Sequence, residues 1–102
     1  MLTLTQEDQF KISNGIQGIY FYATWMPFHK KMNLMISKVE KKYNNLSFVC
    51  VDVDIFKGLT KRFKIESIPT VLILNNGEEV HRITGLVMTS AFKSAFADIF
   101  NS

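Results

Sequence analysis

The stretch from Ile19 to Met32 reads I-Y-F-Y-A-T-W-M-P-F-H-K-K-M and decides the fold. Its first part, Ile19–Ala23, is a continuous apolar run, which is typical of a central strand covered on both faces. After a short link, Met26-Pro27 opens an amphipathic helix, because proline fits the first helical turn, where its missing N–H costs nothing. A strand that leads directly into a helix places free backbone donors at one edge of the sheet. We therefore expect the functional site at this junction.

The rest of the chain predicts further strands and helices in alternation. Apolar residues at spacings of three and four, beginning with Phe28, predict a helix over Pro27–Tyr43, and Leu46–Val53 is a second apolar run. The two runs and this helix form a right-handed parallel βαβ unit. The other expected elements are a short strand over Leu2–Leu4, a helix over Gln6–Ser13 capped by Thr5, a break at Gly18, a helix over Phe56–Phe63 capped by Asp54, antiparallel strands over Val71–Leu74 and Glu79–Thr84 joined by an Asn-Gly turn at Asn75–Glu78, and a last helix capped by Thr89 or Ser90.

The quoted stretch resembles the thioredoxin family, in which an aromatic strand is followed by Trp and then by Cys-x-x-Cys-Lys. Trp25 and Lys30 match this pattern, but Met26 and His29 occupy the two cysteine positions. A second family landmark, Ile-Pro-Thr with a cis proline, matches Ile68-Pro69-Thr70. The resemblance extends over nearly the whole chain. It implies the α/β thioredoxin fold, with a central mixed sheet of four or five strands and helices on both faces.

Composition bounds the remaining possibilities. A chain of 102 residues is long enough for one domain, 1–102, with a single core. Its formal charge of +3 comes from Lys and Arg spread along the sequence, so we expect neither nucleic-acid nor membrane binding. No apolar run approaches the ~20 residues that span a bilayer, and the first residues show no signal peptide. We expect a cytoplasmic protein.

The dithiol chemistry of thioredoxins is missing from the sequence. That chemistry needs a thiolate that attacks and a second thiol that resolves the mixed disulfide. Met26 cannot ionise to a nucleophile, His29 cannot resolve a disulfide, and the one cysteine is Cys50. The resemblance also implies that two positions that support the cysteine chemistry are altered. Tyr20 stands where the family has a buried Asp, and Cys50 stands where it often has a Lys. We therefore expect no disulfide oxidoreductase activity and no catalytic residues.

Other chemistry has weaker support in the sequence. Met26 and His29 could both contact a soft ion such as Cu(I), but two ligands fall short of the three or four usual for a site, so no metal is expected. Cys50 is a candidate nucleophile, although a cysteine in such an apolar strand is more often an inert core residue. We interpret Asp52 as the end of a strand and Asp54 as a helix cap. The sequence shows no Gly-rich phosphate loop and no catalytic triad, so we expect no cofactor.

Three functional interpretations remain open. The first is a polypeptide-binding or adaptor module, because binding an extended peptide needs no thiol. The second is a thiol-independent or single-thiol enzyme, such as a glutathione-linked transferase, and the third is an unused relic of an ancestral site. The first interpretation expects Trp25 to lie on the surface beside Met26, with pH sensitivity added by His29. The residues that match the family's peptide groove are Trp25, Met26, Ile68, Pro69, Gly85 and Leu86.

Overall fold

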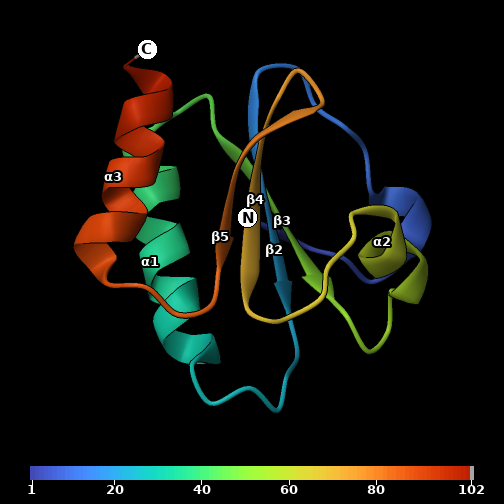
Figure 1. Cartoon of the computed structure of the whole chain (residues 1–102). Helices are drawn as coiled ribbons and strands as arrows, with labels where there is room; N and C mark the ends of the chain where they lie inside the picture. The colour runs from blue at the N-terminus through green and yellow to red at the C-terminus, as the bar shows by residue number, and fades with distance from the viewer. Residues whose placement is uncertain (102) are drawn as a thin grey trace.

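The structure is a computed structural model that describes residues 1–101, and its centre is a five-stranded mixed sheet (Figure 1). The strand order is β1-β3-β2-β4-β5. β2 runs parallel to β3 and antiparallel to β4, and β5 is antiparallel to β4, as the sequence predicts. The strands are β1 (Leu2–Thr3), β2 (Ile16–Tyr22), β3 (Ser47–Asp52), β4 (Thr70–Asn75) and β5 (Glu78–Thr84).

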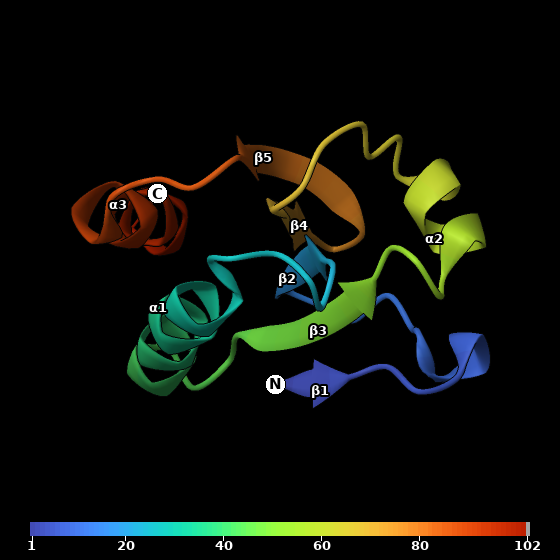
Figure 2. The ribbon, with the colours of Figure 1, turned by 90° about the horizontal axis from the view of Figure 1, so that it is seen from below.

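Helices cover both faces of the sheet. Two long helices, α1 (His29–Lys42) and α3 (Thr89–Phe100), lie side by side on one face. The short helix α2 (Lys57–Arg62) and a 3-10 turn at Glu7–Gln9 lie on the opposite face (Figure 2). This arrangement confirms the expected α/β fold. No helix among residues 1–101 has the length and apolar character needed to cross a membrane.

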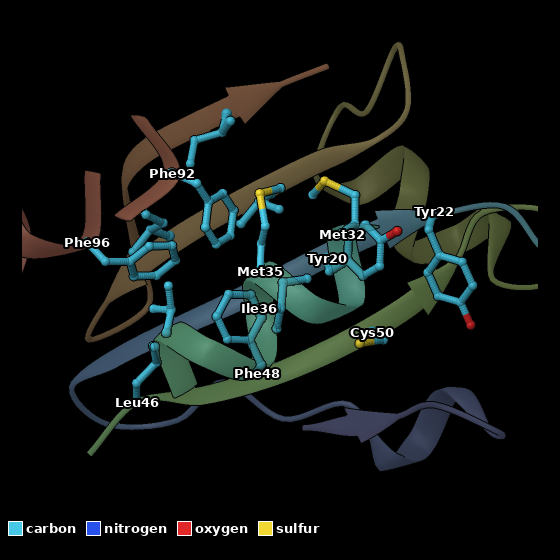
Figure 3. Packing of buried hydrophobic residues seen from close by; sticks show 14 of the residues in the cluster. Tyr20, Tyr22, Met32, Met35, Ile36, Leu46, Phe48, Cys50, Phe92 and Phe96 are labelled. Carbon is cyan, nitrogen blue, oxygen red and sulfur yellow. The ribbon is translucent and has the colours of Figure 1, made fainter. Parts of the chain in front are cut away.

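The buried side chains form two clusters, one on each face of the sheet. Successive residues of a strand point to opposite faces, so Tyr20 and Tyr22 face α1 and α3, whereas Ile19 and Phe21 face α2. Figure 3 shows the cluster on the α1 side, where aromatic rings from the sheet and from α3 fill the space between the layers. This core fixes the start of α1 relative to the end of β2, which is where the functional site was expected.

The central strand is longer than predicted. β2 begins at Ile16, and Gly18, which the sequence suggested as a break, lies inside it opposite Phe48 of β3. A Cβ atom added at Gly18 would lie 2.4 Å from the Phe48 ring. Glycine is therefore needed in the strand because an aromatic side chain of the next strand covers its backbone.

The helix predicted over Gln6–Ser13 is wrong, since only Glu7–Gln9 form a 3-10 turn. The Gln9 side-chain oxygen accepts hydrogen bonds from the backbone N–H groups of Thr5 and Gln6 at 2.9 and 3.2 Å. Further along, the side chain of Gln17 bonds to the backbone of residues 11 and 13. These side-chain bonds satisfy the backbone locally and hold the segment out of a helix.

The predicted helix caps are also wrong. α1 begins at His29 rather than Pro27, and Phe28, which was expected on its buried stripe, occupies the N-cap with 44% of its surface exposed. α2 has Phe56 at its N-cap instead of Asp54, and α3 has Met88 instead of Thr89 or Ser90. None of these N-caps accepts a first-turn hydrogen bond through its side chain. Tertiary packing therefore positions the helix starts more than capping does.

Candidate functional site

The topology gathers four connections at one edge of the sheet, the lower edge in Figure 1. Because β2, β3 and β5 run in the same direction and β4 in the opposite one, the ends of the first three lie beside the start of β4. We call residues 23–28, 53–56, 63–69 and 85–88 the loop edge. Large apolar side chains are exposed along it: Trp25, Phe28, Ile55, Leu86 and Met88.

Met26 is buried at the loop edge, which corrects its expected place on the surface. Only 6% of its area is exposed, and its side chain belongs to the cluster on the α1 side of the sheet. Two turn hydrogen bonds hold this position, from Met26 N to Ala23 O at 3.1 Å and from His29 N to Met26 O at 3.3 Å. The residue at the first cysteine position therefore serves the core, as an apolar thioether is suited to do.

His29 stacks on two tyrosines of β2. Its ring lies 4.6 Å from that of Tyr22, at an angle of 13°, and 6.0 Å from that of Tyr20. Nδ1 of His29 lies 3.1 Å from the Tyr20 hydroxyl oxygen, and Nε2 lies 3.4 Å from Nδ2 of Asn33, one turn further along α1. If the Asn33 amide donates to Nε2, then Nδ1 carries the proton and donates to Tyr20. Apart from the alternation of Tyr20 and Tyr22 along one strand, no pattern in the sequence predicts this stack.

The two tyrosines of the stack are not suited to proton transfer near neutral pH. Burial is the main reason that the pKa of Tyr20 is raised well above its ordinary value, with smaller effects of Cys50 and Tyr22. Burial likewise raises the pKa of Tyr22, helped by Asp52. Both hydroxyls therefore stay protonated, and one of them, that of Tyr20, stands where the resemblance implied an ionisable Asp. Tyr20 and Cys50 are directly paired in the parallel ladder, so the two substituted support positions are neighbours.

Trp25 is fixed by a carboxylate rather than by Met26. Its indole N–H donates to Asp54 Oδ2 at 3.0 Å, while 70% of the side chain stays exposed. Asp54 N in turn donates to Oδ1 of the buried Asp52 at 2.9 Å. Asp54 thus orients the indole instead of capping α2. The ring borders a shallow hollow of about 230 Å³, whose lining includes Ile65, Ile68, Val53, Thr60, Glu66 and Ser67.

The structure brings most of the expected groove residues together. The peptide bond between Ile68 and Pro69 is cis. Gly85 N donates to Pro69 O at 2.8 Å, and Gly85 has a φ of +84° that favours glycine. Leu86, next to it, is 37% exposed. Within the described chain, the backbone N–H and C=O of Ile68 have no hydrogen-bond partner.

Cys50 lies in the core, away from the surface. It is 3% exposed, and its Sγ is 3.4 Å from Sδ of Met1. Burial raises the pKa of its thiol to about 11, although the N-terminal ammonium and a hydrogen bond with Thr3 oppose the shift. A buried thiol with a high pKa is a poor nucleophile. In residues 1–101, no three His, Cys, Asp or Glu side chains are grouped to hold a metal ion.

Comparison with known proteins identifies the family. The family model described as Thioredoxin matches residues 3–98. This chain belongs to the thioredoxin family. It is similar to Thioredoxin-1 of Saccharomyces cerevisiae, with 34% identity over 93% of this chain and 91% of that protein. The oxidised thioredoxin of Plasmodium falciparum has the same fold, with a TM-score of 0.86 and 26% identity over 96% of both chains.

Other relatives match over a smaller part of their length. A Thioredoxin H-type protein of Fagopyrum esculentum is 36% identical over 74% of this chain, which spans 65% of that relative. Glutaredoxin 3 of Danio rerio is 26% identical, and the chain spans 22% of it. As a thioredoxin-family member, this chain departs from the cysteine pair at Met26 and His29.

Proposed function

We propose that this thioredoxin-family chain is redox-inactive and binds an extended polypeptide along the loop edge. With one buried thiol in its 102 residues, it lacks the pair that dithiol exchange requires. The apolar residues of the loop edge nevertheless remain exposed to solvent, with Trp25 at 70% and Ile55 at 67%. Clustered exposed apolar side chains are typical of interaction sites.

The observation that carries this proposal is the unpaired backbone of Ile68. Its N–H and C=O stand free, within residues 1–101, between the hollow beside Trp25 and the Pro69–Gly85 hydrogen bond. An extended peptide could pair with these two groups and place its side chains on either side, as peptides do at exposed sheet edges. Met26 contributes no contact in this proposal, because its side chain is buried.

Charge gives the proposed partner a preferred composition. Glu66 lines the hollow, and the carboxylate of Asp54 lies against the indole of Trp25. A segment with a large apolar residue flanked by Lys or Arg would fill the hollow and pair with these acids. A segment rich in Asp or Glu would be repelled.

Fluorescence anisotropy with a labelled, unfolded polypeptide tests the proposal. The probe is a reduced and carboxymethylated protein, which offers extended apolar segments but no disulfide. We expect saturable binding that weakens at least fivefold in W25S and in L86S. The matched control is L34S, because Leu34 is also exposed, at 64%, but lies on α1 outside the loop edge. Equal loss in all three variants, or no binding by the native chain, would refute the proposal.

A further inference from the structure

A second candidate site lies away from the loop edge, between the two long helices. A hollow of about 170 Å³ is lined by Lys38, Val39, Lys42 and Tyr43 of α1 and its end, and by Lys93 of α3. Three of the five lining residues are cationic, and none is acidic. The helices that form the hollow are neighbours on one face of the sheet in both ribbon views (Figures 1 and 2).

Among residues 1–101, the positive charges around this hollow have no carboxylate partners. The ion pairs found among residues 1–101 join the N-terminal ammonium to Glu40 and Arg82 to Glu79, so they leave Lys38, Lys42 and Lys93 unpaired. Lys38 and Lys42 are four residues apart on one helix, a spacing at which like charges repel. An anion bound between them would remove this repulsion.

The apolar wall of the hollow contacts one of the three lysines, Lys42. The Tyr43 ring stacks on that of Phe100 with centroids 4.1 Å apart and an angle of 3°. Lys42 Nζ lies 5.6 Å from the Tyr43 ring centroid, within the range of a cation–π contact. With one ring face against Phe100 and an ammonium near the ring, Tyr43 is poorly placed to stack on a nucleobase.

We propose that this hollow binds a compact, multiply charged anion of the pyrophosphate class. Its volume is below the roughly 300–1,000 Å³ of pockets that hold drug-sized ligands, which favours a compact ligand over a nucleotide. The hollow includes the C-terminal end of α1, where backbone carbonyls carry partial negative charge. The ammonium groups of the three lysines are therefore the hydrogen-bond donors to the anion. The negative charge of the ligand is what the hollow recognises.

An NMR titration with sodium pyrophosphate at constant ionic strength tests this site. We expect saturable shifts in the signals of Lys38, Lys42, Tyr43 and Lys93. Removing one charge at about 4 Å in water should raise the dissociation constant roughly fivefold, so K38Q and K93Q, one from each helix, should each weaken binding by that factor. The matched control K31Q removes an exposed lysine from the first turns of α1 and should change it less than about twofold.

Three results would overturn the proposal. Equal weakening in K31Q would show binding by diffuse surface charge, and shifts reproduced by chloride at the same ionic strength would show screening alone. Tighter saturation of the same residues by a hexaglutamate peptide than by pyrophosphate would assign the hollow to an acidic protein segment instead. Exposed Lys→Gln changes leave the core untouched, so loss of folding does not complicate the comparison.

Discussion

The hydroxyl oxygen of Tyr20 lies 3.1 Å from Nδ1 of His29. A side chain of β2 and a side chain of α1 are therefore hydrogen-bonded to each other beneath the loop edge. In the family pattern, these positions carry an acid and a resolving thiol. Here they form an aromatic stack with Tyr22. The substitutions therefore support one another: the buried tyrosine and the histidine share a hydrogen bond, and the histidine ring covers the tyrosine.

The first prediction concerns redox activity. The native chain should not accelerate insulin reduction by a dithiol donor above the buffer rate, because it has no second thiol to resolve a mixed disulfide. The double variant M26C/H29C should show measurable turnover, but less than a thioredoxin with the full motif, because Tyr20 and Cys50 remain in the support positions. Turnover by the native chain would contradict redox silence.

The second prediction isolates the Tyr20–His29 hydrogen bond. Y20F should lower the free energy of unfolding by about 1 kcal/mol in urea denaturation, since it leaves a ring nitrogen of His29 unpaired. Y22F is the matched control, because Tyr22 stacks on the same ring but its hydroxyl makes no hydrogen bond within residues 1–101. Equal losses in the two variants would mean that the hydrogen bond contributes nothing specific.

The third prediction concerns the contact between Gly18 and Phe48. G18A should cost about 1–3 kcal/mol, because the new methyl group would overlap a ring 2.4 Å away. In the double variant G18A/F48L, the smaller side chain should recover part of this loss, which appears as a favourable coupling in a double-mutant cycle. Strictly additive losses would show that the ring does not limit the position.

The fourth prediction distinguishes a core cysteine from a single-thiol enzyme. At about pH 8, a pKa near 11 instead of the ordinary 9.0 lowers the thiolate fraction of Cys50 about a hundredfold, and burial slows access further. A thiol reagent should therefore label the native chain at least that much more slowly than the chain in denaturant. Labelling at the unfolded rate would favour glutathione-linked or other single-thiol chemistry.

The sequence was enough to predict the architecture, because its signals are strong and local. The apolar runs around Ile19 and Val49, the helix between them and the Asn-Gly turn at Asn76 each determine an element. It also named Trp25 and Pro69 of the loop edge, because they stand in recognisable motifs, but it did not single out the exposed Ile55 and Met88. Helix starts were predicted poorly, because polar residues that suit caps, such as Asp54, have other partners in the structure.

Side-chain partners across the fold could not be read from the sequence. The Trp25–Asp54 hydrogen bond joins residues 29 positions apart, and the burial of Met26 depends on how β2 turns into α1. The sequence fits Met26 either as a surface contact or as a core residue. The conformation of the turn between β2 and α1 decides between the two. The hollow lined by lysines could not be predicted either, because nothing in the α1 pattern shows that Lys93 of α3 lies beside Lys38 and Lys42.

The most direct test of polypeptide binding at the loop edge is an NMR titration of the native chain with an extended peptide that carries a large apolar residue between lysines. The peptide should shift the Trp25 indole N–H and the Ile68 and Leu86 amides first, while signals of Met26 and the exposed face of α1 change little. Shifts that begin on the α1 face, or no saturable shift at Trp25 and Ile68, would contradict binding at the loop edge.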